Sequence, residues 1–313
     1  MSVTEVRVSR VSRGRMTRPP LTARLRGPGA APYVFVLPFY VLYGLFLVVP
    51  IGIGGYLSLT EWAGLGTPQW VGPANYERLL SDGSFRTAVG NTVIYVAFSV
   101  GVVVPVALLV AQALNTRGLK GRDFFRLTFF MPVVLSPIII ALVFTLLYDR
   151  EYGLLNAALR GFFGWGGIDW LGEPSWAKVS VMLLVLWRWT GYLTIFFLAG
   201  LKNIPRDFYE AAEIDGAGRV RTFFSVTVPM LKPVTAFVAV TVLVGTAQIL
   251  EEPMLLTKGG PGEATLSVAM FIYREAFTRQ QLGYAAAAGV VMFLLVFVLG
   301  RAANAVYGVG RER

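Results

Sequence analysis

The stretch EAAEIDGAGRVRTFFSVTVPMLKP, residues 210–233, interrupts an apolar chain with a cluster of charges. With the five residues before it, it lies between two long apolar runs and contains four acids and four bases: Asp207, Glu210, Glu213, Asp215, Arg206, Arg219, Arg221 and Lys232. Long apolar runs of this kind span membranes as helices, because backbone groups in lipid must be satisfied within the segment. The stretch therefore predicts a polar hairpin between two membrane-spanning helices.

The first half of this hairpin has the pattern of a short amphipathic helix. Pro205 suits a helix start, because Pro is tolerated where the first N–H groups have no partner. Helical spacing then puts three acids on one face and small or apolar side chains roughly opposite: Asp207, Glu210 and Glu213, against Phe208, Ala211 and Ala212. Gly216 follows where a C-terminal glycine stop is expected. The helix suits docking to a basic partner, although a solvated loop with ordinary charge pairs has the same pattern.

A second short helical stretch is predicted through Phe223 and Phe224. Pro229 and Pro233 close it, because Pro removes a backbone hydrogen bond, and they lead into the next apolar run.

Composition excludes several classes of protein. Of 313 residues, 55% are hydrophobic and only 15% are charged, whereas about a quarter of residues are charged in a typical soluble domain. The chain has no Cys and no His, so disulfides, thiol nucleophiles, imidazole bases and Cys/His zinc sites are excluded. We expect no catalytic residue, metal or cofactor in this chain.

Six charge-poor windows predict an all-α membrane protein with six transmembrane helices. The windows lie between the charges at 26 and 61, 86 and 117, 126 and 149, 178 and 202, 232 and 251, and 279 and 301, and one of them contains Arg188. Pro105 in the second window, and Pro132 and Pro137 in the third, predict kinks.

The distribution of bases predicts the orientation in the membrane. The N-terminal tail holds seven Arg, and the segments 115–126, 201–233 and 301–313 hold four, five and three bases, against eight in the other three loops. The richer side should be cytoplasmic, so both termini and the charged hairpin face inward. The net charge of +10 then serves topology and anionic lipid, not nucleic acid.

Two regions are expected along the chain. Residues 1–30 form a basic cytoplasmic tail that we expect to be disordered, and residues 31–310 form the membrane domain with its cytoplasmic loop at about 202–233. The first apolar run is longer than the ~7–15 residues of a signal-peptide core, which favours an uncleaved anchor.

The hairpin resembles the EAA loop of permease subunits of bacterial ABC importers. That pattern is matched by Glu210, Ala211, Ala212, Asp215, Gly216, Ala217, Phe223, Phe224, Val226 and Pro229. NIPRDFYEAA, GLLNAAL, DWLGEPSWA and LLTKGGPGEATLSVAMFIYREAF resemble segments of the carbohydrate branch of this family. The resemblance extends from about Tyr33 to Arg301, and it is greatest to the first of two permeases in importers of oligosaccharides or glycerol-3-phosphate.

The resemblance implies a type I permease fold in the bacterial cytoplasmic membrane and a set of partners. These are a second homologous permease, two ATPase subunits that use ATP and Mg, and an extracytoplasmic sugar-binding protein. Six residues map onto the ATPase-docking helix: Glu210, Ala211, Ala212, Asp215, Gly216 and Ala217. Because the chain lacks a G-x-x-x-x-G-K-[ST] phosphate cradle, ATP must be hydrolysed in a partner.

Charged residues at membrane depth are candidate substrate contacts. Each costs ~2.5–3.5 kcal/mol on insertion scales and therefore faces an interior or a cavity. Sugar recognition uses carboxylates, amides and flat aromatic rings, which gives the candidates Trp187, Arg188, Tyr192, Gln248, Glu251 and Glu252, with Trp189 as a further ring. Alternatively, Arg188 pairs with a neighbouring carboxylate and the tryptophans fill helix interfaces. Asn91 and Tyr95 are secondary candidates, since Asn in a membrane helix also bonds neighbouring helices.

Other functions remain open at this point. A secondary carrier or channel would show internal repeats and mid-membrane acids, which we do not find, and a membrane enzyme would need Asp, Glu or Ser chemistry. Within the importer class, glycerol-3-phosphate, a phosphodiester or a polyol are alternative substrates, and a phosphate would favour contact with Arg188.

Overall fold

The computed structural model describes residues 31–116, 120–164 and 166–307. The predicted basic tail, residues 1–30, lies outside the described residues. The chain divides into two compact units, Met1–Ile53 and Gly54–Arg313.

The first unit is helical and apolar where it is described. It comprises α2 (Ala31–Tyr43), the π-helical segment η1 (Gly44–Val48) and the first residues of α3 (Val49–Leu57). These pieces follow one another without a break, and Phe35–Leu57 is long enough to cross a membrane.

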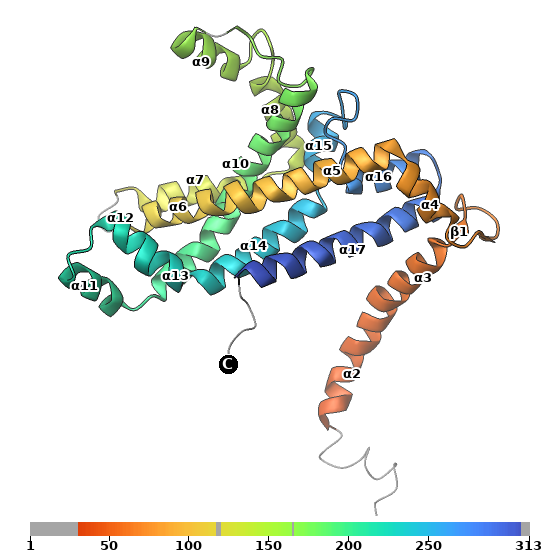
Figure 1. Ribbon diagram of the computed structural model, residues 1–313, viewed down its shortest axis with the longest axis horizontal. Helices are drawn as coiled ribbons and strands as arrows, with labels where there is room; N and C mark the ends of the chain where they lie inside the picture. Colours follow the sequence, from red (N-terminus) through yellow and green to blue (C-terminus); the bar gives the residue numbers. More distant parts are fainter. Residues whose placement is uncertain (1–30, 117–119, 165, 308–313) are drawn as a thin grey trace, which may run out of the picture. The chain divides into compact units, whose positions relative to one another are not determined.

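The second unit starts with a short hairpin and continues almost wholly as helices (Figure 1). In the hairpin, β1 (Thr60–Glu61) pairs antiparallel with β2 (Gln69–Trp70). The elements from the hairpin to α10 are α4 (Ala74–Ser81), α5 (Gly83–Phe98), η2 (Ser99–Val103), α6 (Val104–Asn115), α7 (Arg122–Val134), α8 (Pro137–Leu147), α9 (Leu154–Phe163) and α10 (Pro174–Lys202). The remainder are α11 (Arg206–Ile214), α12 (Arg219–Thr222), η3 (Phe223–Thr227), α13 (Val228–Met230), α14 (Lys232–Ala247), α15 (Glu251–Leu256), α16 (Val268–Tyr273), η4 (Arg274–Thr278) and α17 (Leu282–Tyr307).

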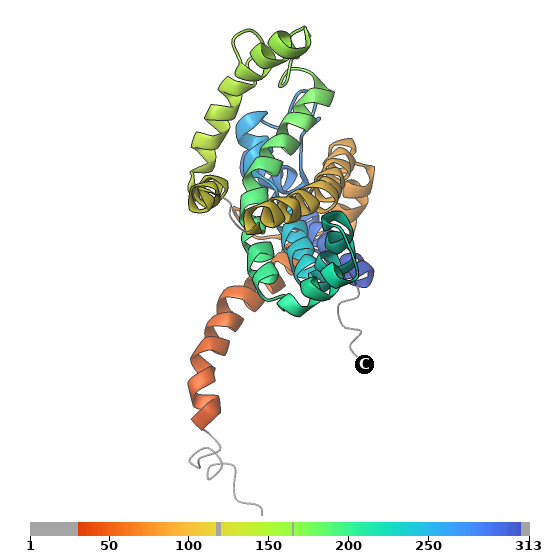
Figure 2. The same ribbon diagram turned by 90° about the vertical axis from the view of Figure 1, so that its left-hand side faces the viewer.

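All six predicted spans have counterparts among the described helices. Four are single helices: Phe35–Leu57, Gly83–Asn115, Pro174–Lys202 and Leu282–Ala305. The other two are bent pairs, Asp123–Val134 with Pro137–Leu147 at 106° and Arg219–Met230 with Lys232–Ala247 at 70°. The first bend is clear in Figure 2 and lies between Pro132 and Pro137, where the sequence predicts a kink.

Pro105 does not break its helix, because a π turn precedes it. Gly83–Asn115 is continuous through η2, which ends two residues before Pro105, and the N–H of Val104 donates to the carbonyl of Ser99. The same arrangement precedes Pro50 and Pro229, after η1 and η3. Proline would clash with the carbonyl four residues back in a regular helix, and a local π turn changes that spacing.

The core of the second unit forms around α10, which packs along α6 and α7. On its other side, α14 lies beside α17 and α5 (Figure 1). α10 and α7 approach closely at Gly191 of α10, where a Cβ atom would lie 1.6 Å from the carbonyl oxygen of Phe129 in α7. Only glycine leaves α7 room to cross there, so Gly191 fixes the packing of these two spans.

Candidate functional site

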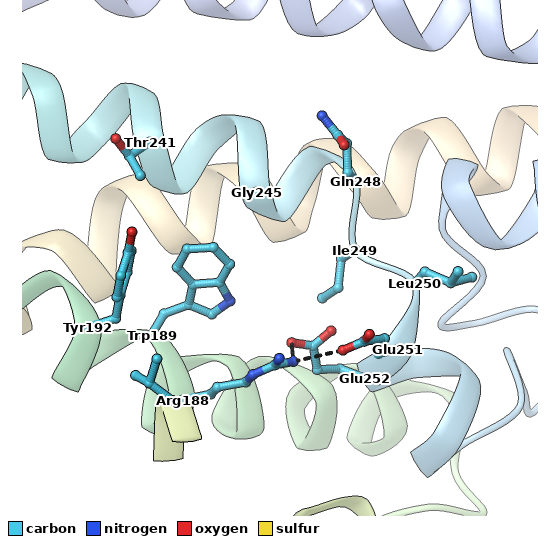
Figure 3. Close-up of a pocket in the computed structure, with 11 residues that line it drawn as sticks. Arg188, Trp189, Tyr192, Thr241, Gly245, Gln248, Ile249, Leu250, Glu251 and Glu252 are labelled. Carbon is cyan, nitrogen blue, oxygen red and sulfur yellow. Dashed lines mark hydrogen bonds and ion pairs between the residues drawn. The ribbon is translucent and has the colours of Figure 1, made fainter. Parts of the chain in front are cut away.

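The first candidate site is a cavity of about 500 Å³ lined mainly by α10, α14 and the start of α15 (Figure 3). Its lining residues are Val133, Arg188, Trp189, Tyr192, Thr241, Gly245, Gln248, Ile249, Leu250, Glu251 and Glu252.

An ion-pair cluster forms one wall of this cavity. Nη1 of Arg188 lies 2.8 Å from Oε1 of Glu252 and 3.3 Å from Oε2 of Glu251. The side chain of Glu252 is 7% exposed and that of Glu251 is 53% exposed. One guanidinium therefore faces two carboxylates, and the interpretation that Arg188 pairs with a neighbouring carboxylate is confirmed.

Helix termini place the two acids. α14 ends at Ala247, and α15 begins at Glu251, so both carboxylates lie in the first turn of a helix, where the backbone dipole favours negative charge.

Aromatic rings form another part of the lining. The indole of Trp189 lies against Gly245 of α14, where a Cβ atom would come within 2.3 Å of the ring carbon Cη2. Tyr192 stands edge-on to Trp189, with ring centroids 5.9 Å apart. The absence of a side chain at Gly245 thus lets a flat ring lie between α10 and α14 (Figure 3).

Most of the predicted contact residues lie together in the lining of the cavity: Arg188, Tyr192, Gln248, Glu251 and Glu252, with Trp189. Trp187 is not among the lining residues, and its ring packs against Phe144 of α8, with ring centroids 5.3 Å apart. Sequence reasoning missed Thr241 and Gly245, although they lie seven and three residues before Gln248, a spacing that puts all three on one helix face.

The secondary candidates Asn91 and Tyr95 have a different place. The Asn91 amide donates to the carbonyls of Leu266 (2.9 Å) and Glu263 (3.2 Å), and the Tyr95 hydroxyl donates to the carbonyl of Thr265 (3.3 Å). They bind α5 to the loop after α15 and do not line the cavity described above.

The second candidate site is the charged hairpin. Its first helix, α11, begins after Pro205 and ends before Gly216, as the sequence predicts. Gly216 has φ +71°, its N–H donates to the carbonyl of Glu213 (3.0 Å), and the next N–H, of Ala217, donates to that of Ala212 (2.9 Å). This is a Schellman motif, which needs the left-handed conformation that glycine adopts without strain.

The outer surface of α11 is free within the described chain. The three acids Asp207, Glu210 and Glu213 are exposed, as is Ala211, whereas Ala212 is buried. Exposed apolar side chains surround the helix: Phe208, Ile214, Val220 and Phe224. A charged helix edged by apolar side chains has the composition of a docking surface.

The second half of the hairpin differs in one respect from the prediction. Pro229 does not close the second helical stretch, because it lies inside a continuous helix from α12 to α13 after the η3 turn. The chain turns by 70° only at Leu231, immediately before α14 and Pro233. Tyr209 of α11 and Thr227 of η3 share a hydroxyl hydrogen bond of 3.2 Å, which fastens the two halves together.

Comparison with known proteins shows to which family the chain belongs. Residues 103–307 match the family described as binding-protein-dependent transport system inner membrane component. The chain belongs to this family. It is a multi-pass component of the inner membrane, and membership in a transport family decides against the secondary-carrier and enzyme alternatives.

Relatives and solved structures agree along nearly the full length. The chain is 35% identical to the probable ABC transporter permease protein YurN of Bacillus subtilis, over 90% of this chain and 97% of that protein. It is 37% identical to the lactose transport system permease protein LacF of Rhizobium radiobacter, over 85% and 90%. A subunit in the crystal structure of a bacterial alginate importer has the same fold, with a TM-score of 0.77, 24% identity, and coverage of 90% and 96%. The predicted permease fold is thereby confirmed, while the sidedness of the termini stays a prediction.

Proposed function

We propose that this permease subunit imports a neutral sugar or oligosaccharide across the bacterial cytoplasmic membrane. Relatives support this substrate class, since they include permeases named for lactose and for arabinooligosaccharides. The proposed assembly contains a second, homologous permease, two ATPase subunits and an extracytoplasmic sugar-binding protein. A related alginate transporter has been crystallised with a periplasmic protein that holds an alginate pentasaccharide.

The charged residues of the cavity favour a neutral substrate over an anionic one. Among the described residues that line the cavity, Arg188 is the one cation, and both Glu251 and Glu252 lie within ion-pair distance of it. A phosphate would have to compete with two carboxylates for a single guanidinium and would face their repulsion. Sugar hydroxyls, in contrast, can donate to carboxylate oxygens that Arg188 leaves free.

The rings of Trp189 and Tyr192 favour a sugar over an open-chain polyol. A pyranose presents a flat apolar face that can stack on an indole, and a cavity of about 500 Å³ falls within the ~300–1,000 Å³ typical of ligand sites. Tyr192, Gln248, Glu251 and Glu252 are proposed to contact the hydroxyls. Glycerol-3-phosphate and phosphodiesters are the less favoured alternatives.

The EAA hairpin is proposed to couple this path to ATP hydrolysis. Glu210, Ala211, Ala212, Asp215, Gly216 and Ala217 form the docking element, and Glu210 pairs with a basic residue of the ATPase. ATP and Mg are used in that partner. This places the hairpin, and both termini, on the cytoplasmic side, as the distribution of bases predicts.

The test is reconstitution of the importer with the partners encoded beside it. Binding assays on the sugar-binding protein encoded beside this chain identify the sugar. Uptake of that sugar into proteoliposomes is then measured with and without ATP. We expect ATP-dependent uptake of the neutral sugar and none of glycerol-3-phosphate, and we expect Glu210→Lys to abolish uptake at normal subunit abundance. ATP-independent uptake, or wild-type uptake by Glu210→Lys, would overturn the proposal.

A further inference from the structure

A second groove, of about 560 Å³, lies apart from the sugar cavity between α6, α7 and α10. Its walls are apolar over most of their length and include Leu127 and Phe130 of α7 and Ile195 and Leu198 of α10. Leu127 is 62% exposed and Ile195 is 42% exposed, so the groove opens at the surface of the second unit.

One end of this groove is basic. Arg126 and Lys202 line it, and Asp123 is the one acid among the described residues of the lining. Nη1 of Arg126 lies 3.5 Å from Oδ1 of Asp123, but that carboxylate side chain is 98% exposed, so solvent screens the pair. Within the described chain, Lys202 lies in no ion pair, which leaves a surplus of positive charge at this end.

One nitrogen of the Arg126 guanidinium has no hydrogen-bond partner among the described residues. This atom, Nε, is buried. A buried donor without an acceptor is destabilising, because it has lost its hydrogen bonds to water. The site therefore calls for an acceptor that enters the groove from outside.

The two bases of the groove lie at helix ends, where lipid head groups are expected to meet the spans. Lys202 is the last residue of α10, and Arg126 lies in the second turn of α7, so both stand where spans leave the bilayer. The two segments that join them to the chain, 115–126 and 201–233, are on the side richer in bases. Anionic lipids are attracted to basic pockets between helices on that side.

We propose that this groove binds one anionic glycerophospholipid of the surrounding membrane. The phosphate accepts hydrogen bonds from Arg126 and Lys202, and one acyl chain lies along the wall formed by Leu127, Phe130 and Ile195. An apolar helix of a neighbouring subunit would cover the wall equally well, but it would leave the buried Nε without an acceptor. A lipid provides both an acceptor for the basic end of the groove and an acyl chain for its apolar wall.

The test compares lipid retention by assembled importers that carry three single variants. Arg126→Gln removes the phosphate donor, and Ala199→Phe fills the apolar part without changing charge, because Ala199 is an exposed residue of the lining. Lys120→Gln is the matched control, since it removes an exposed base that does not line the groove, at the same end of α7. Complexes are purified in detergent, and phosphatidylglycerol and phosphatidylcholine added in equal amounts are measured by mass spectrometry.

We expect phosphatidylglycerol to be retained at about one per complex by the wild type and by Lys120→Gln. Retention should fall about tenfold in Arg126→Gln, which loses a charge-assisted hydrogen bond, and equally in Ala199→Phe. Monodisperse size-exclusion profiles establish that each complex is assembled. Wild-type retention in both groove variants would overturn the proposal, as would an Ala199→Cys crosslink to a second subunit in complexes that retain the lipid.

Discussion

Gly245→Ala tests the link between the aromatic wall and transport. In the structure a Cβ atom at position 245 would lie 2.3 Å from Cη2 of Trp189 and 2.9 Å from Cζ2. Carbon atoms in contact are about 3.5–4.0 Å apart, so the indole must retreat by roughly 1.2 Å or more. Overpacking of this kind costs ~1–3 kcal/mol.

The displaced ring is the one proposed to stack on the sugar. A loss of about 1.4 kcal/mol at that contact corresponds to a tenfold effect. We therefore expect the initial rate of ATP-dependent uptake, at saturating sugar-loaded binding protein, to fall about tenfold. Subunit abundance in the membrane, measured by immunoblot, should stay unchanged.

Two further variants separate the clash from a general effect of a new side chain. Gly90→Ala adds the same methyl group to α5, at an exposed position where the described residues offer no clashing atom within 4 Å. It should transport within about twofold of the wild type, because Ala is the better helix former. Adding Trp189→Phe to Gly245→Ala removes the clashing ring atoms and should restore part of the rate. Wild-type uptake by Gly245→Ala would refute the reasoning, and so would a double variant no better than the single one.

Gly191→Ala puts a Cβ atom 1.6 Å from the carbonyl oxygen of Phe129, so we expect the monodisperse peak in size-exclusion chromatography to disappear; a normal profile would contradict the close crossing. Gly216→Pro cannot adopt φ +71°, so uptake should be lost while the subunit stays in the membrane, and coupled uptake would refute the role of the turn. Burial opposes ionisation of Glu263, but its hydrogen bond to Arg274 (2.7 Å) lowers its pKa overall, so this pair stabilises the fold above the usual pKa of 4.5 and the stability is lost as pH falls through the lower value. Between pH 6 and pH 3 the Tm of the wild type should therefore fall more steeply than that of Glu263→Gln, and equal slopes would contradict this.

Local sequence patterns predicted the spans and the ends of the charged hairpin. Apolar length identifies a membrane helix without reference to its neighbours, which is why all six spans were found. Pro205 and Gly216 likewise act through their own backbone, so the limits of α11 could be predicted from the sequence. The prediction that Pro229 ends the second helical stretch is wrong, because the η3 turn before it accommodates the proline and π turns have no simple sequence signal.

Features made by distant segments were beyond local reasoning. Arg188 and Glu252 are 64 positions apart in the chain. Their location within membrane spans suggests that each needs a partner, but the sequence does not show that they are each other's partner. The contact of Trp189 with Gly245 depends on how α10 crosses α14, and the basic groove depends on how α7 bends away from α8. Trp187 and Trp189 have the same residue type, and only the rotation of α10 decides which of the two faces the cavity.

The 70° bend at Leu231 allows α14 to tilt as a rigid rod about its first residues. Its sixteen residues extend about 24 Å from that pivot, and beyond its far end, at Gln248, lie the carboxylates that pair with Arg188. A tilt of about 5° at the pivot would swing the far end by about 2 Å, which is enough to open a 2.8 Å ion pair beyond hydrogen-bonding distance. A small rotation of the charged hairpin at one end of α14 would thus be enough to break the ion pair between Arg188 and Glu252 at its other end.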